Sequence, residues 1–179
     1  MAMKMDRRAF LKTSAAVAVA VSMTGLLGGC SDDAIGTNFG MFQATAGAAS
    51  CDTNADDWGD VPATGWEGYI EVKVRIKDTT GKKQPEPLCA SNFFTLKING
   101  QAIDNCTGGT LLSNGGYIKL EKDRPKEGWM RFTLKEDQKA LYEAVAAKKA
   151  EVTFTIEGGR AREDYKLDYE TKTFVKQTV

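Results

Sequence analysis

The stretch Ile70-Glu71-Val72-Lys73-Val74-Arg75-Ile76-Lys77 decides the fold class of this chain of 179 residues. Branched apolar residues alternate with charged residues at every position, so an extended strand would have one apolar face and one solvated face. The turn-forming run Asp78-Thr79-Thr80-Gly81 follows, and Pro85 and Pro87 exclude the next segment from a central strand. The pattern therefore predicts a half-buried β-strand over residues 70–77.

The same alternation recurs along the rest of the chain and predicts further strands. Apolar residues occupy every second position over residues 94–98, 118–120, 130–134, 152–156 and 165–169. Asn99-Gly100 predicts a tight hairpin that returns over residues 101–103. Residues 171–175 are expected to pair with the strand before them. Glycine pairs at 108–109 and 115–116 predict that residues 106–116 form a loop with hairpin turns.

One helix is predicted, over residues 136–149. The segment consists of good helix formers, and Leu141 and Val145 lie on one apolar stripe. With seven or so short strands separated by turns, the chain is predicted to be mainly β, an immunoglobulin-like β-sandwich with this helix inserted between two strands. The alternative is an α+β domain with a single antiparallel sheet and the helix on one face.

The N-terminus has the composition of a targeting segment. Basic residues come first, a mild apolar run over residues 15–27 follows, and Leu27-Gly28-Gly29-Cys30 ends it. This order is typical of a secretory signal peptide. The apolar run is shorter than the roughly 20 residues that a permanent membrane-spanning helix needs.

The basic part reads Asp6-Arg7-Arg8-Ala9-Phe10-Leu11-Lys12. It resembles the twin-arginine signal peptide, whose usual form is Ser/Thr-Arg-Arg-x-Phe-Leu-Lys. The matching residues are Arg7, Arg8, Phe10, Leu11 and Lys12. Asp6 departs from the pattern. The resemblance implies export by a pathway that carries folded proteins.

The end of the segment, Leu27-Gly28-Gly29-Cys30, resembles the lipobox of bacterial lipoproteins. The resemblance implies that residues 1–29 are removed, that Cys30 receives a lipid on its sulfur, and that the new N-terminus is acylated with a chain such as palmitate. Each buried acyl CH₂ contributes about 0.8 kcal/mol to membrane binding, so three chains would anchor the protein permanently. Ser31 after the cysteine favours the outer membrane of the cell envelope over the inner one, with the domain facing the periplasm.

Residues 30–65 are rich in Ala, Gly, Thr, Ser and Asp and show no periodicity. They are predicted to be a flexible tether between the anchor and a domain over residues 66–179. Phe39, Met41 and Phe42 are unusual in a linker and leave open that part of it packs on the domain.

Composition excludes several classes of protein. The chain has no histidine, which removes the commonest general base, the Ser-His-Asp arrangement and His-ligated metals. The first 29 residues hold four of the 24 basic residues and one of the 24 acidic residues, so residues 30–179 carry a net charge of −3. A nucleic-acid partner is therefore not expected.

Three cysteines remain besides Cys30. In an oxidising compartment they predict one disulfide and one leftover thiol. Cys89 and Cys106 flank a compact segment and are the favoured pair, with Cys51 bonded to either of them as the alternative. The leftover thiol is expected to be buried, because free cysteine behaves as a small apolar residue.

Two further side-chain sets are weaker candidates. Oxygen ligands spaced as in a calcium loop are Asp52, Asn54, Asp56, Asp57 and Asp60. Asp57 stands where an EF-hand needs Gly, so we interpret the set as a solvated acidic linker and predict no metal or cofactor. Trp58, Trp66 and Trp129 would suit sugar stacking, but core packing is the favoured interpretation.

The sequence thus predicts a membrane-anchored lipoprotein of the cell envelope with a non-catalytic binding or interaction module for a protein or polymer partner. One alternative is an accessory subunit of an exported redox complex. Another is a small thiol-dependent enzyme, which would need a cysteine of lowered pKa in an electropositive setting.

Overall fold

Strand β3 (Gly68–Asp78) is the strand that the alternating stretch predicts, and it lies inside the main sheet. Its apolar residues are all fully buried: Ile70, Val72, Val74 and Ile76. The charged residues between them are half-buried or exposed on the other face. These features belong to a computed structural model. It describes residues 35–53, 65–113 and 115–178.

The remaining elements of the described residues are short. The strands are β1 (Thr37–Asn38), β2 (Phe42–Thr53), β4 (Leu88–Cys89), β5 (Phe94–Ile98), β6 (Gln101–Ile103), β7 (Cys106–Gly108), β8 (Tyr117–Ile118), β9 (Lys126–Leu134), β10 (Val152–Gly158), β11 (Ala161–Asp168) and β12 (Thr173–Lys176). The helices are the 3-10 turns Ala90–Asn92 and Glu136–Gln138 and the α-helix α2 (Lys139–Ala146).

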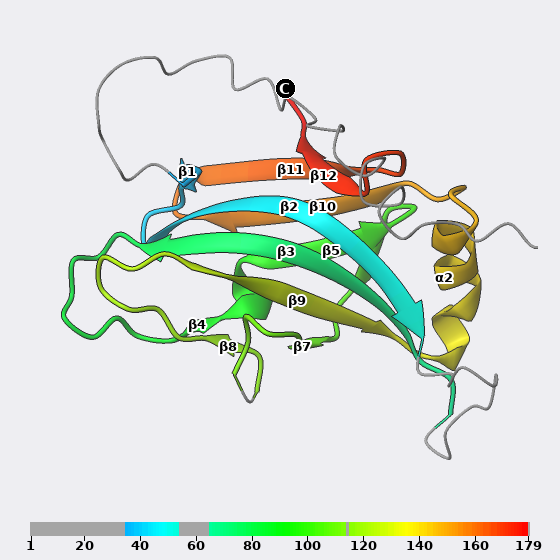
Figure 1. Ribbon diagram of the computed structural model, residues 1–179, viewed down its shortest axis with the longest axis horizontal. Coiled ribbons are helices and arrows are strands. Elements are labelled where there is room, and N and C mark those ends of the chain that lie inside the picture. The colour runs from blue at the N-terminus through cyan, green and yellow to red at the C-terminus, as the bar shows by residue number, and fades with distance from the viewer. Residues whose placement is uncertain (1–34, 54–64, 114, 179) are drawn as a thin grey trace, which may run out of the picture. The chain divides into compact units, whose positions relative to one another are not determined.

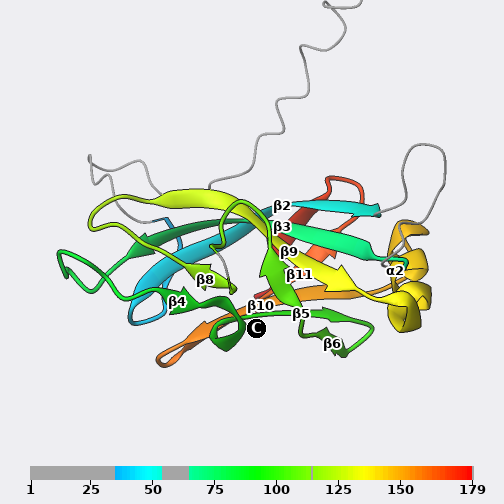
Figure 2. The same ribbon diagram turned by 90° about the horizontal axis from the view of Figure 1, so that it is seen from below.

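Ten of these strands form one antiparallel sheet, in the order β6-β5-β10-β11-β12-β2-β3-β9-β7 with β1 beside β2. The two edge strands, β6 and β7, are joined by only Asp104 and Asn105, so the chain passes directly from one edge to the other. Next to this link the Thr133 amide of β9 donates to the Asn105 carbonyl at 3.0 Å, which extends the pairing of β9 with β7. The sheet is therefore nearly closed into a barrel (Figures 1 and 2).

The prediction of a mainly β fold with one helix is confirmed. The immunoglobulin-like sandwich is not confirmed, because the main strands share one sheet and do not divide into two. Only β4 and β8 pair separately.

Local turn chemistry accounts for the predictions that match best. Asn99 and Gly100 have φ of 50° and 82°, which suits the tight hairpin between β5 and β6. The loop predicted over residues 106–116 is partly wrong, because β7 lies within it and pairs with β9. Gly109 has φ of 96°, and a Cβ there would lie 2.2 Å from the Trp129 carbonyl oxygen. This glycine permits the close approach of two strands and does not form the predicted hairpin turn.

The flexible tether predicted over residues 30–65 is wrong for β1 and β2. Strand β2 lies between β12 and β3 in the sheet. Phe42 and Ala44 are fully buried, and the Phe39 ring stacks on Phe42 with a centroid separation of 5.4 Å. An alanine-rich segment has little intrinsic tendency to form a strand, so its pairing with neighbours on both sides decides its conformation. The domain therefore begins before residue 66, whereas residues 30–34 and 54–64 lie outside the described residues.

The core fills the interior of the curved sheet. Phe154 on β10 contacts three other rings, Phe94, Phe132 and Phe174, with centroid separations of 6.0, 6.0 and 5.7 Å. These residues come from β5, β9 and β12. Aromatic pairs of this kind contribute about 0.5–1.5 kcal/mol each beyond their buried area.

Helix α2 covers one end of the sheet (Figure 1). The predicted helix over residues 136–149 is shorter in the structure, because its first turn is a 3-10 turn and the chain leaves the helix before Lys148, whose φ is 59°. Val145 is buried, and the Tyr142 ring contacts the edge of Trp66 at a centroid separation of 5.4 Å. No helix of the described residues is long and apolar enough to cross a membrane.

A buried carboxylate joins the first and last strands of the domain. Glu163 on β11 is 8% exposed and accepts hydrogen bonds from Thr37 Oγ1, from Lys176 Nζ and from Tyr165 Oη, the last at 2.7 Å. Burial opposes its ionisation, but the three donors together outweigh burial and hold the pKa of Glu163 below its ordinary value.

Substituting Glu163→Gln is expected to lower the free energy of unfolding by about 1–3 kcal/mol, because charge-assisted hydrogen bonds in a buried site are lost. A lowered pKa in the folded state stabilises the protein above the unfolded pKa of about 4.3. The difference in the free energy of unfolding between wild type and variant should therefore be largest near pH 7. It should shrink as the pH falls through the pKa that Glu163 has in the folded state. Urea denaturation at several pH values measures it.

The matched control is Glu157→Gln, because Glu157 is exposed on β10 and its side chain has no hydrogen bond or ion pair within the described residues. It should change stability by less than about 0.5 kcal/mol. Equal effects of the two substitutions, or a difference independent of pH, would contradict the role given to Glu163.

Candidate functional site

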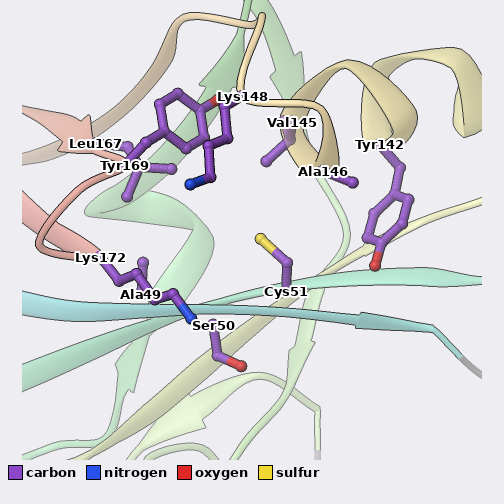
Figure 3. Close-up of a pocket in the computed structure, with 10 residues that line it drawn as sticks. All are labelled: Ala49, Ser50, Cys51, Tyr142, Val145, Ala146, Lys148, Leu167, Tyr169 and Lys172. Atoms are coloured by element: carbon purple, nitrogen blue, oxygen red, sulfur yellow. The ribbon is translucent and has the colours of Figure 1, made fainter.

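A cavity of about 390 Å³ lies beneath helix α2, between β2 and the end of β11 (Figure 3). We call it the α2 cavity. Its apolar lining consists of Ala49, Val145, Ala146 and Leu167, and its polar lining of Ser50, Cys51, Tyr142, Lys148, Tyr169 and Lys172. The lining thus combines an apolar wall with two cations, a thiol and three hydroxyls.

The cavity exists because β2 separates from its neighbour. Strand β2 pairs with β3 as far as Thr53, but it pairs with β12 only at Ala48. The register of β2 against β3 also shifts between Ala46 and Ala49. The last contact with the β12 side is the Ala49 amide, which donates to the Lys172 carbonyl at 2.8 Å. Beyond it, within the described residues, β2 has no strand partner on the cavity side, and α2 lies over the gap.

Cys51 occupies the β2 wall, and its sulfur points into the cavity (Figure 3). Although Cys51 is exposed as a residue, desolvation by the surrounding wall raises the pKa of its thiol, and the nearby Lys172 only partly offsets this. The thiol is therefore protonated at neutral pH. A nucleophilic cysteine needs the opposite shift of its pKa, so the arrangement does not favour a thiol-dependent enzyme.

Two tyrosines hold fixed positions in the wall. The Tyr169 hydroxyl donates to the Ala150 carbonyl at 2.7 Å, and the Tyr142 ring is held against Trp66. Burial raises the pKa of both hydroxyls, and the nearby Cys51 raises it further. Both tyrosines are neutral at physiological pH and offer ring surface to the cavity.

Two lysines reach the cavity from different turns. Lys148 follows α2, and Lys172 lies between β11 and β12. Both have positive φ, 59° and 53°, which non-glycine residues seldom adopt. Neither forms an ion pair with any residue that the structure describes, and none of the described carboxylates lines the cavity. The lining therefore combines apolar groups with two cations.

The structure places the other two predicted disulfide cysteines elsewhere. Cys89, Cys106 and Cys51 are all free, so no disulfide links the described cysteines. Cys106 is 5% exposed in the core, and burial raises its pKa to about 12. Cys89 lies on β4 with its sulfur 3.3 Å from the Ser91 hydroxyl. With all three free, no single leftover thiol can be assigned, although Cys106 is the buried one of the three, and the favoured pairing of Cys89 with Cys106 is not found.

The predicted acidic and aromatic sets do not form a site within the described residues. Of the calcium-like set only Asp52 is described, and its carboxylate accepts a hydrogen bond from the Thr53 amide at 2.8 Å. No group of three metal-ligating side chains occurs in the described part of the chain. Trp66 packs in the core, Trp129 lies half-buried on β9, and Trp58 lies outside the described residues.

Cys30 and the twin-arginine residues also lie outside the described residues, so the structure does not bear on lipidation or export.

Sequence reasoning missed most of the α2 cavity. It placed Lys148 near the end of a helix and Tyr169 on a strand, but no motif connects these residues with Lys172 or with β2. Only the divergence of β2 from β12 brings them together. Lys172 fell within residues 171–175, which were expected to pair as a strand, whereas the structure places it in the turn before β12.

The comparisons with known proteins give no further guide to the site. No protein-family model, curated protein or solved structure matches the chain. The chemistry of the α2 cavity therefore has to be inferred from its own residues.

Alkylation of Cys51 is expected to require an unusually high pH. Because desolvation raises its pKa, the rate of reaction with iodoacetamide should reach half its maximum above the value of about 8.5 typical of a free thiol. Substituting Lys172→Met should raise the pH of half-maximal alkylation rate, the midpoint, still further, because the cation that favours the thiolate is removed. Peptide mass spectrometry over a pH series measures the rate at each cysteine separately.

Lys149→Met is the control for this series, because Lys149 neighbours Lys148 in the chain but does not line the cavity. Its midpoint should equal that of wild type. A wild-type midpoint below that of a free thiol would overturn the argument and favour the thiol-dependent enzyme.

Proposed function

We propose that the chain is a lipid-anchored protein of the cell envelope whose β domain is a non-catalytic binding module, and that the α2 cavity is its binding site. The observation that carries the binding role is the cavity itself, which joins an apolar wall to two cations without ion-pair partners in the described residues. Anchoring through Cys30 rests on the resemblance of the N-terminal segment to lipoprotein signals.

The size and composition of the cavity support a small ligand. Small-molecule sites usually enclose about 300–1,000 Å³, with mostly apolar walls and a few polar groups that orient the ligand. A volume of about 390 Å³ lies at the lower end of this range. Its apolar walls come from β2, β11 and α2, so that part of the site is largely preformed.

The chemistry of the lining favours binding over catalysis. The Cys51 thiol and the hydroxyls of Tyr142 and Tyr169 are all shifted toward their protonated forms, and catalytic bases and nucleophiles need shifts in the other direction. The lining therefore suits recognition by shape and charge.

Native mass spectrometry of the full chain, extracted from its own membranes, tests this proposal. The expected species begins at Cys30, carries three acyl chains and releases one small-molecule adduct when the collision energy is raised. Substituting Ala146→Trp, which places a large side chain at the cavity wall, should remove the adduct. Ala140→Trp on the exposed side of the same helix should retain it.

Each part of the proposal can fail separately. An unlipidated mature mass would contradict the anchor. Retention of the adduct in the Ala146→Trp variant would contradict the assignment of the site. Isolation in a stable complex with a metal- or flavin-bearing protein would instead support the accessory-subunit alternative.

A further inference from the structure

The two lysines that line the α2 cavity come from segments that are separate in the chain. Lys148 follows helix α2, and Lys172 follows β11. In Figure 3 the Lys148 amine points into the cavity, and the Lys172 side chain extends along β2 toward Ser50. Two like charges at one cavity repel each other, so an anion between or beside them would relieve that repulsion.

Two carboxylates near these lysines in the chain are engaged elsewhere. Glu151 forms an ion pair with Lys166 at 2.6 Å. Asp168 accepts hydrogen bonds from the Thr171 hydroxyl at 2.9 Å and from the Glu170 amide at 2.8 Å. Neither Lys148 nor Lys172 forms an ion pair with any residue that the structure describes.

The rest of the lining is mainly apolar and aromatic. Val145 and Leu167 contribute aliphatic groups, and Tyr169 presents its ring because its hydroxyl is bound to the Ala150 carbonyl. The Tyr142 ring is held in place by Trp66. Flat apolar groups gain both buried area and ring contacts in such a site.

We infer that the α2 cavity selects a small organic monoanion, with an aromatic or compact apolar body against Val145, Leu167 and the tyrosine rings and one carboxylate held by Lys148 and Lys172. This inference rests on the proposed function, because it names the ligand class of the same site. A dianion such as a phosphate ester with a polar body would leave the apolar wall unused, and a neutral apolar molecule would leave both cations without a partner.

Two isosteric probes test the inference: naphthalene-2-carboxylate and its neutral amide, naphthalene-2-carboxamide. The readout is the alkylation rate of Cys51 in the full, lipidated chain held in nanodiscs, because this thiol lies in the cavity wall. Since lipid takes up more of the neutral amide, protection is plotted against the free concentration of each probe, measured in the same sample. Cys89, which does not line the cavity, is the internal control. Rates are compared with the probe-free rate of the same variant.

The carboxylate is expected to protect Cys51 at a concentration about tenfold lower than the amide, and neither probe should protect Cys89. The double substitution Lys148→Met and Lys172→Met roughly keeps the length of both side chains. It should bring the ratio of the two protecting concentrations, amide to carboxylate, close to one. Lys149→Met should leave the ratio unchanged. In wild type, raising the salt from about 0.05 M to about 0.5 M should also narrow the ratio, because ions screen the attraction.

The outcomes separate this inference from the proposed function. Equal protection by both probes would overturn the preference for an anion and leave the cavity as a binding site. A tenfold ratio that survives the double substitution would overturn the assignment to Lys148 and Lys172. If neither probe protects Cys51 and native mass spectrometry finds no adduct, both the inference and the binding role fail.

Discussion

The edge-to-face contact between Phe132 and Phe154 is the interaction on which the rest of the domain depends. The two rings come from β9 and β10, which are not hydrogen-bonded neighbours in the sheet. Their contact is possible only because the sheet curves until its inner face packs against itself. Once this interior is filled, the short Asp104-Asn105 link can pass from one edge strand to the other, so packing and chain connectivity support the same closure.

The pairing of β2 explains why a cavity forms where the sheet meets helix α2. Strand β2 follows β3 along the whole sheet, but its pairing with β12 is limited to Ala48. The strands must separate beyond that point, and the gap would expose the apolar interior if nothing covered it. Helix α2 provides the cover with Val145, yet it does not fill the space completely. The α2 cavity is therefore a direct result of how the sheet ends.

The accuracy of the sequence predictions follows how local the controlling interaction is. Strand β3 and the β5–β6 hairpin were predictable because alternation and the Asn99-Gly100 turn are encoded within a few residues. Strand β2 was not, because its small residues become a strand only between two partners supplied by distant segments. The α2 cavity was hidden for the same reason, since Lys148 and Lys172 meet through tertiary structure alone.

Charged side chains near the two ends of β11 differ in whether they have a partner of opposite charge. Near β1, Glu163 is buried, but its charge is matched by Lys176 and by two hydroxyl donors. Near α2, Lys148 and Lys172 sit in turns with unfavourable positive φ and have no anionic partner in the described residues. The backbone conformation of Lys148 is that of a helix C-cap, because its amide donates to the Val145 carbonyl at 2.9 Å and the Lys149 amide donates to the Ala144 carbonyl at 2.8 Å. The local backbone thus fixes where this lysine stands, but it supplies no partner for the charge. The same fold can supply a matched partner at one end, which makes a ligand the simplest physical explanation for the unmatched cations at the other.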